Sequence, residues 1–457
     1  MDASEQEEIQ LLSRAFEENE RRDETEEQDS LIQPNNSTLL SANWASVFMC
    51  GEMIGASSLS LPKALQNTGF YTGLVIYVII TCISGTFAYI LSKTYATLRR
   101  DVKEYLNGAH IRDPYPQISH FVLGRKVRLL VIGCIFLSDF LGTAALILLP
   151  ADMIVRSFEI KILPNHSVKQ NMRLWVTIGT IVITPFTWND RPKDNKFVGM
   201  LALCSALLGN ILIVVLFILV GDLGTVSEPS NNPESATKYI LAIGLLLTTA
   251  DGFDILPNIQ EDMQNANEYK KVIIRSYLLF SALTIPVMVG GYLLFHKHHT
   301  MSENLIIELV HVGSYIKNPA RFLAFRVIAY ATLVLYVVHI KMSTVLQLNP
   351  TFQYMERLFP CREGLCWQRC LLRSTILFLV LIFVIAAPEL LPILSFNGSI
   401  LYVILGVVIP GLMYIRVFDY IAIARKSMIL SIMLIFVVYL SINSYCNIKE
   451  IFGKITI

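Results

Sequence analysis

Charged residues are scarce in this chain of 457 residues. Asp, Glu, Lys and Arg make up 16% of it and hydrophobic residues make up 54%, and the mean hydropathy is +0.53. Soluble domains average about 25% charged residues, so this composition predicts a polytopic membrane protein. The formal net charge is only +1 and no basic run occurs, which argues against a nucleic-acid partner.

The chain also lacks several signatures of enzymes and secreted proteins. Residues 1–38 are polar and acidic, so no signal peptide is predicted and the first membrane span is expected to direct targeting. Most of the eight cysteines lie in apolar stretches, where packed thiols are expected rather than a disulfide framework. No nucleotide-binding loop, catalytic triad, nucleophile elbow or zinc-ligand spacing is present. We therefore expect no enzyme activity, no cofactor and no metal.

Long apolar runs are what the chain does contain, and the first of them is unusual. Residues 43–66 are long enough to cross a bilayer, which takes about 20 apolar residues. The centre of this run holds Gly51, Glu52, Gly55 and Ser57, so a continuous helix would carry the cost of glycine and bury a charge. A helix that is broken at the midplane is predicted instead. Irregular backbone at that depth must line a cavity or be enclosed by protein, so the break predicts a binding site.

Residues 1–38 are predicted to form a disordered cytosolic tail, because their composition cannot bury enough apolar surface to offset the entropy of ordering. Two stretches of the tail have an acid four positions before a Leu-Leu or Leu-Ile pair, at Leu11-Leu12 and Leu31-Ile32. Both resemble acidic dileucine signals, which clathrin adaptors recognise. We therefore expect sorting to an endosomal or lysosomal membrane, with the plasma membrane or other vesicles as alternatives.

Ten further apolar runs follow, which makes eleven predicted membrane spans. These runs cover residues 72–91, 129–151, 174–186, 197–220, 239–259, 272–295, 322–340, 371–388, 391–415 and 428–442. With a cytosolic amino terminus, the loops on the cytosolic side hold about twice as many Lys and Arg residues as the loops on the other side, which favours that orientation. Asn165, in the sequon Asn165-His166-Ser167, then lies in an external loop and is a predicted glycosylation site.

The sixth run repeats the pattern of the first. It holds Asp251 and Gly252 at its centre with Pro257 downstream, as the first run holds Glu52, Gly55 and then Pro62. Five spans separate the two patterns, and an odd number gives the two halves opposite topology, which indicates an inverted repeat with the site between its halves. The predicted membrane domain covers 39–446. It is divided into repeats at 42–220 and 238–415 and an extra span at 427–445, and a short luminal or extracellular tail follows at 447–457.

Broken helices of this kind suit a zwitterion. The N–H groups that begin the second half, around Gly55 to Ser58, have no helical partners and favour a carboxylate. Carbonyls that end the first halves, near 48–51 and 247–250, can accept hydrogen bonds from an ammonium group, together with Asp251. The predicted substrate-binding residues are Gly51, Glu52, Met53, Ile54, Gly55, Ala56, Ser57, Thr249, Asp251 and Gly252.

Several of these motifs resemble the amino acid/auxin permease family of the amino acid/polyamine/organocation superfamily. The resemblance is carried by Gly55 to Ala64 with Gly69, Tyr115-Pro116 with Phe121, Gly124 and Arg125, Asp251-Gly252 with Pro257-Asn258-Ile259 and Met263, and Ala387-Pro388 with Gly398 and Pro410. It implies an all-α membrane protein of the leucine-transporter type, with eleven transmembrane helices. These form a five-plus-five inverted repeat with discontinuous helices 1 and 6, plus one extra helix. The resemblance also implies alternating access of a small amino acid, similar to proton-coupled and vesicular amino acid transporters.

The coupling ion can be argued from the eighth span. A sodium site would need a pair of small hydroxyls facing the first break, where this span has Tyr336, Val337 and Val338. Ionisable groups at membrane depth favour a proton, because burial shifts their pKa values toward cellular pH. The candidate proton-coupling residues are Glu52, Asp139, Asp251 and His339. Sodium remains the alternative ion, and a purely structural, hydrogen-bonded role remains the alternative for His339.

Taken together, these features predict a secondary active transporter of small amino acids. An amino-acid-sensing receptor of the same fold and an ion channel are the alternatives. The expected partners are the amino acid, membrane lipid and clathrin adaptors at the tail.

Overall fold

The computed structural model describes most of the chain from Leu40 to Gly453. The gaps in this description are residues 106–112, 158–166, 189–191, 222–228, 232, 234, 253–254, 296–301, 313–315, 317, 360–365, 387–389 and 419–420. The predicted sorting residues Leu11, Leu12, Leu31 and Ile32 and the predicted glycosylation site Asn165 lie outside the described residues. The described residues are helical, apart from connecting segments and one isolated bridge between Leu40 and Met263.

Eight helical segments among the described residues are long and apolar enough to cross a membrane. They are α4 (Phe70–Tyr105), α6 (Arg125–Ser157), α8 (Pro192–Gly221), α11 (Tyr269–Phe295), α13 (Pro319–Gln347), α15 (Trp367–Ala386), the composite segment from Pro392 to Val417, and α18 (Ile423–Gly453). The other three expected spans differ from these. The first and sixth are interrupted, and the fourth, α7 (Val168–Thr187), begins with a polar turn.

Both predicted interruptions are confirmed. The first apolar run forms α2 (Ala42–Met53), then the 3₁₀ turn η2 (Ala56–Ser60) and α3 (Leu61–Thr68). The sixth forms α9 (Ala236–Thr249) and α10 (Leu256–Glu261). Glycine and an acid stand at each break. A continuous lipid-facing helix would be unfavourable there, because glycine destabilises a helix interior and a charge at membrane depth is costly.

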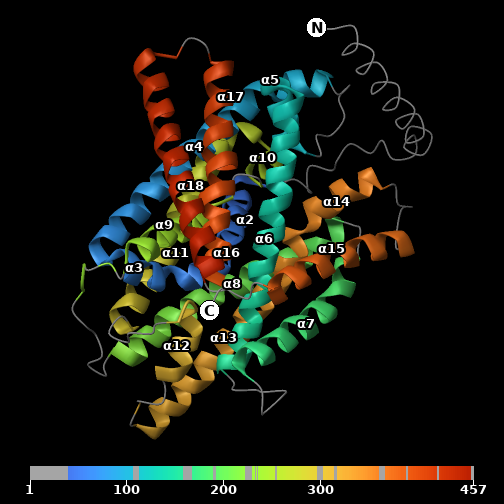
Figure 1. Cartoon of the computed structure of the whole chain (residues 1–457). Coiled ribbons are helices and arrows are strands. Elements are labelled where there is room, and N and C mark those ends of the chain that lie inside the picture. The colour runs from blue at the N-terminus through green and yellow to red at the C-terminus, as the bar shows by residue number, and fades with distance from the viewer. Residues whose placement is uncertain are drawn as a thin grey trace.

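The two interrupted helices cross in opposite directions. The second half of one packs against the first half of the other, since α3 contacts α9 and α2 contacts α10. At one end of the crossing, the Leu40 N–H donates to the carbonyl of Asp262, and the Gln264 N–H donates to the carbonyl of Leu40, each at 2.9 Å. At the other end, the Phe70 N–H donates to the Ser230 carbonyl at 3.0 Å. Figure 1 places α2 in the middle of the bundle.

The composite segment contains an irregularity that the sequence did not predict. It runs through α16 (Leu390–Phe396), two π-helical stretches, η5 (Asn397–Leu401) and η6 (Val403–Val408), and α17 (Ile409–Val417). The widened π turns bring Gly398 against α9, where a Cβ atom would overlap the Gly244 carbonyl and the Thr248 side chain. Only glycine fits at this position, so α9 is held rigidly just before its break.

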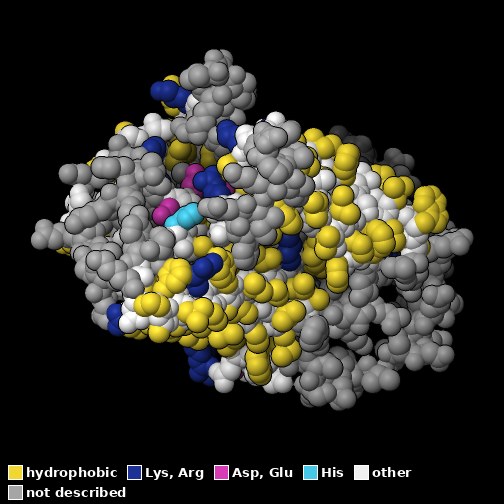
Figure 2. Space-filling view, turned by 90° about the horizontal axis from the view of Figure 1, so that it is seen from below, with side chains coloured by type: hydrophobic (Ala, Val, Ile, Leu, Met, Phe, Trp, Pro, Cys, Tyr) yellow, Lys and Arg dark blue, Asp and Glu magenta, His cyan; other side chains and the backbone are white. Residues whose placement is uncertain are grey.

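Three short helices also lie between the predicted spans. They are α5 (Pro114–Leu123), α12 (Leu305–Val312) and α14 (Asn349–Leu358). Figure 1 shows α5 near the top of the bundle and α12 near its bottom. Seen from the α12 end, hydrophobic side chains cover much of the described surface, and charged side chains gather around a hollow on one side (Figure 2).

The last helix extends beyond the predicted extra span at both ends. The extra span was expected at 427–445, followed by a tail, but α18 continues to Gly453 and includes residues 447–453. Asn443 and Asn447, near the carboxyl end of this helix, are both buried and hydrogen-bonded. The Asn443 side chain donates to the Ile240 carbonyl of α9 at 2.9 Å. Asn443 therefore docks α18 onto α9, whereas the Asn447 amide donates to the Asn443 carbonyl within α18.

Candidate functional site

The two breaks are in contact with each other. A Cβ atom built on Gly252 would lie 3.4 Å from Cγ of Met53, the last residue of α2. Gly252 has φ of +138°, a conformation that glycine adopts and other residues avoid. Residues predicted from two distant runs therefore line one place in the fold.

The break after α2 leaves backbone donors beside open space. Ser58 turns back, and both its N–H and its hydroxyl donate to the Gly55 carbonyl, at 3.2 and 2.7 Å. Ala56 and Ser57 begin η2, so their N–H groups have no partners within that turn. A Cβ atom built on Gly55 would have no described atom within 4 Å. A small anionic group can therefore approach these amides, as predicted for a carboxylate.

The carbonyl acceptors lie slightly later in the chain than predicted. Because α2 continues to Met53, the carbonyls of residues 48–50 are used within the helix, and the Ile54 N–H donates to the Cys50 carbonyl at 3.1 Å. The Gly55 N–H donates to the Met53 carbonyl at 3.0 Å. Gly51 and Glu52 lie in the last turn of α2, so their carbonyls are at its carboxyl end. The helix continues past Gly51 because Glu52 and Met53 are compatible with helix, and it ends at Met53, with the non-helical Ile54 as its C-cap.

The break after α9 presents Asp251. Oδ1 of this half-buried aspartate accepts a hydrogen bond from the Gly252 N–H at 2.8 Å. Tyr277 of α11 also donates to the Ala250 carbonyl at 3.4 Å. The Thr249 hydroxyl, by contrast, is buried and bonded back to the Leu246 carbonyl at 2.6 Å. Thr249 thus lies at the break with its hydroxyl engaged inside α9.

His339 of α13 binds the first break directly. Its Nε2 lies 2.9 Å from the Ile54 carbonyl and its Nδ1 lies 2.8 Å from the Ala202 carbonyl of α8. The side chain is 2% exposed. Both partners are acceptors, and a neutral imidazole has only one N–H, whereas an imidazolium donates through both nitrogens. The geometry satisfies both carbonyls only in the protonated form.

Asp139 lies in a different setting from the other candidates. It is buried on α6, and its Oδ2 accepts from the Thr351 hydroxyl of α14 at 2.7 Å. The neighbouring Ser138 donates to the Asn397 side chain at 3.1 Å. Asp139 therefore binds α14, whereas Glu52 lies at the end of α2, partly buried.

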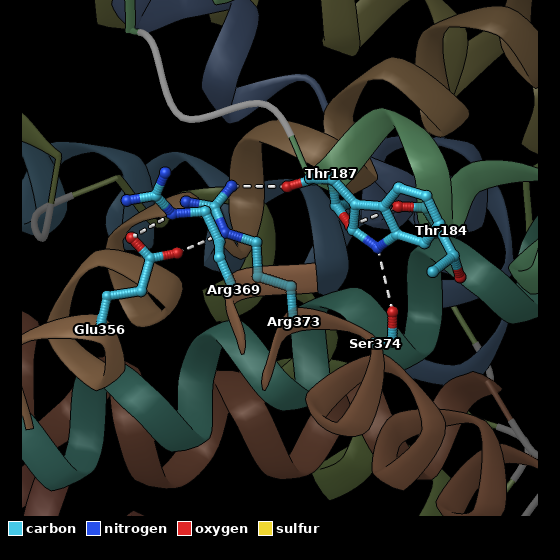
Figure 3. Close-up of polar contacts among 7 residues, drawn as sticks. Thr184, Thr187, Glu356, Arg369, Arg373 and Ser374 are labelled. Atoms are coloured by element: carbon cyan, nitrogen blue, oxygen red, sulfur yellow. Dashed lines mark hydrogen bonds and ion pairs between the residues drawn. The ribbon is translucent and has the colours of Figure 1, made fainter. Parts of the chain in front are cut away.

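A buried ionic cluster also binds α14 to its neighbours. Glu356 accepts from Arg373 Nε at 2.6 Å, and Arg369 Nε lies 3.3 Å from its second oxygen. Arg373 also donates to the Thr187 carbonyl at the end of α7 at 2.5 Å, and beside it Trp188 donates to Ser374 (Figure 3). The cluster joins α7, α14 and α15.

Sequence reasoning missed several residues that position the breaks. Ala202 and Tyr277 contribute a carbonyl and a single hydroxyl, and neither residue type is unusual in a membrane helix. Glu261 at the end of α10 was also missed, although it is a buried acid that accepts from Tyr95 and Arg99 of α4, each at 2.6 Å. An acid at a span end was the available signal for Glu261.

Comparison with known proteins places this arrangement among transporters. The family model described as transmembrane amino acid transporter protein matches residues 39–448. Amino acid transporter AVT1I of Arabidopsis thaliana is 24% identical over 412 residues, which cover 88% of this chain and 89% of that protein. Amino acid transporter AVT1H of the same plant is 22% identical over 376 residues, covering 81% and 80%. These relatives are transporters rather than enzymes.

Solved structures show the same fold at low sequence identity. MhsT in complex with L-phenylalanine matches with a TM-score of 0.60 and 13% identity, covering 88% of this chain and 98% of that one. A manganese transporter of Eremococcus coleocola matches with a TM-score of 0.59 and 12% identity, covering 90% and 87%. The fold is therefore that of leucine-transporter-type proteins. With a family model that spans nearly the whole membrane domain, the chain belongs to the family of transmembrane amino acid transporter proteins, to which the amino acid/auxin permeases belong.

Proposed function

We propose that this protein is a secondary active transporter that carries a small amino acid by alternating access, coupled to protons. One observation carries the proposal: two interrupted helices cross in opposite directions and meet at Met53 and Gly252. Irregular backbone at the midplane is costly unless it binds something, and here it exposes donors and acceptors together.

The ends of the broken helices define the binding mode. The substrate carboxylate lies at the N–H groups of Ala56 and Ser57, in the space beside Gly55. The ammonium group lies toward the carbonyl end of α2 and toward Asp251, where negative partial charge collects. The name amino acid transporter for relatives such as AVT1I, and the L-phenylalanine complex of MhsT, support this class of substrate.

The proposed topology has eleven spans in a five-plus-five inverted repeat with α18 as the extra span. The reciprocal ties at both ends of the crossing support it, because α2 and α9 each begin where the other helix finishes. The Lys and Arg distribution supports a cytosolic amino terminus. The two dileucine-like stretches of the tail support adaptor-mediated sorting to an endosomal or lysosomal membrane.

Proton coupling rests on His339. This side chain reaches the Ile54 carbonyl from the eighth span, where a sodium site would need small hydroxyls. The imidazolium ties the break to α8 and α13 by two donated bonds, and loss of the proton leaves one carbonyl facing a lone pair. Protonation at this residue thus favours one arrangement of the break, which is what coupling requires.

Purified protein in liposomes tests the proposal. Uptake of a panel of labelled amino acids is measured under a pH gradient alone, a sodium gradient alone and neither, together with counterflow at equilibrium. We expect saturable counterflow of at least one small amino acid and accumulation driven by the pH gradient. Binding without counterflow would contradict transport and favour a sensor, and accumulation driven by sodium alone would contradict the proton assignment.

A further inference from the structure

A cavity of about 780 Å³ opens on the outer surface of the bundle between α4 and α11. Its rim is formed by side chains of both helices that are exposed in this structure, namely Val78 (47%), Ile274 (50%) and Leu278 (65%). The volume lies within the range of small-molecule sites, which is about 300–1,000 Å³. In a membrane protein, such a cavity on the outside of two spanning helices faces lipid.

The walls of the cavity suit a hydrocarbon chain. Most of the lining is apolar, and several of its hydroxyls are already hydrogen-bonded. The Thr81 hydroxyl donates to the Tyr77 carbonyl and the Thr86 hydroxyl to the Cys82 carbonyl, each at 2.8 Å. The Tyr77 hydroxyl lies 2.6 Å from that of Thr284. A ligand with many hydrogen-bonding groups would find few partners here, whereas an acyl chain needs none.

One end of the cavity carries a positive charge. Lys270, in the first turn of α11, is exposed and lines the cavity. The adjacent Lys271 is directed elsewhere, since its Nζ lies 2.6 Å from Glu268, and Arg275 is bonded to Asn43 at 2.6 Å. An ammonium group at the end of an apolar channel complements a phosphate that is attached to a hydrocarbon chain.

We propose that this cavity binds an anionic phospholipid, with the phosphate at Lys270 and one acyl chain between α4 and α11. In the orientation proposed above, the amino-terminal end of α11 faces the cytosol. The lipid therefore comes from the cytosolic leaflet, which is the leaflet that carries anionic lipids.

The same cavity is connected to both interrupted helices. Tyr277 lines it and donates to the Ala250 carbonyl at the break of α9, at 3.4 Å. One residue earlier, the Ser276 hydroxyl donates to the Ser46 carbonyl of α2 at 3.0 Å. A lipid that fills the cavity fixes α11 against α4 and so stabilises the helix that contacts both α2 and α9. Bound anionic lipid is therefore a positive regulator of the site.

Photocrosslinking measures the binding without any transport step, so it fails or succeeds independently of the proposed function. The full-length protein is placed in phosphatidylcholine nanodiscs that contain a photoreactive acyl chain on either phosphatidylserine or phosphatidylcholine. We expect phosphatidylserine to label peptides of α4 and α11 several-fold more than phosphatidylcholine. Lys270→Ala should reduce this labelling to the phosphatidylcholine level, and the matched control Lys271→Ala should leave it unchanged. Equal labelling by both lipids, or equal loss in both variants, overturns the proposal.

A second variant blocks the hydrocarbon part of the cavity. A Cβ atom on Gly85 would lie 3.8 Å from the ring of Tyr277, an ordinary contact, so that a longer side chain continues into the cavity. We expect Gly85→Leu to elute as the wild type does on size exclusion and to lose phosphatidylserine labelling of α4 and α11. Undiminished labelling in Gly85→Leu overturns the assignment of the acyl chain to this cavity, and so does displacement of the label by a sterol but not by phosphatidylserine.

Discussion

At the scale of the residue, the proposed proton coupling depends on His339, which contacts the first break. Two carbonyl oxygens at 2.8 and 2.9 Å from its ring nitrogens demand two donors, and only the charged ring has them. Burial opposes that charge. Hydrogen bonding therefore favours the charged ring and burial favours the neutral ring. A small change around Ile54 shifts the equilibrium between these two forms of His339.

The first prediction concerns His339→Gln. Glutamine can still donate to one carbonyl but cannot carry a proton, so we expect counterflow to persist while the pH gradient no longer drives accumulation. The carbonyl left without a donor should lower the free energy of unfolding by about 1–3 kcal/mol. Uptake and counterflow in liposomes, with thermal unfolding alongside, check both parts.

His120 of α5 supplies the control for that experiment. Partial burial lowers the pKa of His120, and Arg128 and Arg125 lower it further, so the ring is neutral at pH 7 and above. We expect His120→Gln to leave the pH dependence of uptake unchanged. Loss of pH-driven uptake in this variant as well, or its retention in His339→Gln, would contradict the role given to His339.

The second prediction concerns Gly252→Ala. The φ of +138° strains any residue with a Cβ atom, which costs about 1–3 kcal/mol, and the new methyl group would press on Met53. We expect transport to fall more than expression does. Gly133→Ala on α6 is the matched control, because open space surrounds that glycine and alanine favours a helix. Initial uptake rates normalised to folded protein check this, and equal effects at both positions would contradict it.

At the scale of the element, a buried ionic cluster joins α7, α14 and α15 (Figure 3). Arg373 is 2% exposed and bonds both Glu356 and the end of α7. Its guanidinium also lies 5.1 Å from the Phe352 ring of α14. A helix outside the membrane core, α14, is thus fixed by buried charge as well as by packing.

The third prediction concerns Arg373→Ala. Removing one member of a buried ionic cluster costs about 3–5 kcal/mol, because the groups left behind lose their compensation. We expect a clear drop in the thermal unfolding temperature of the purified protein. Arg156→Ala is the control, since its ion pair with Asp152 involves a half-exposed side chain and exposed pairs contribute about 0–1 kcal/mol. Similar drops in the unfolding temperature of both variants would show that the buried cluster stabilises the protein no more than an exposed ion pair does.

The elements also show what sequence can and cannot reveal. Both breaks could be predicted because each apolar run contains glycine, an acid and a downstream proline. All three residue types disfavour a continuous helix that spans the membrane. The π turns at Asn397–Val408 could not, because their side chains are ordinary for a helix and the widening follows from how Gly398 packs on α9. The partners of His339 escaped prediction for a similar reason, since a backbone carbonyl carries no sequence signature.

At the scale of the whole molecule, the crossing of the interrupted helices is tied at both ends. Leu40 pairs with the strand-like turn after α10, and Glu261 joins α10 to Tyr95 and Arg99 of α4. At the opposite end, Phe70 bonds to Ser230. Alternating access requires that one set of ties opens while the other holds.

The fourth prediction concerns where the whole molecule is sorted. We expect Leu11→Ala/Leu12→Ala combined with Leu31→Ala/Ile32→Ala to raise the amount of protein at the cell surface several-fold, because adaptors would no longer retrieve it. Arg21→Ala/Arg22→Ala, in the same tail but outside both motifs, is the control. Surface biotinylation measures the result, and an unchanged surface fraction in the quadruple variant would contradict adaptor sorting.

The most direct test of the central claim is the density of a transported amino acid bound to the full-length protein, obtained by electron cryo-microscopy. The account predicts density between the two breaks, with the carboxylate at the N–H groups of Ala56 and Ser57 and the amino group toward Asp251. Substrate density away from both breaks, or a continuous helix through residues 42–68 in the bound state, would contradict it.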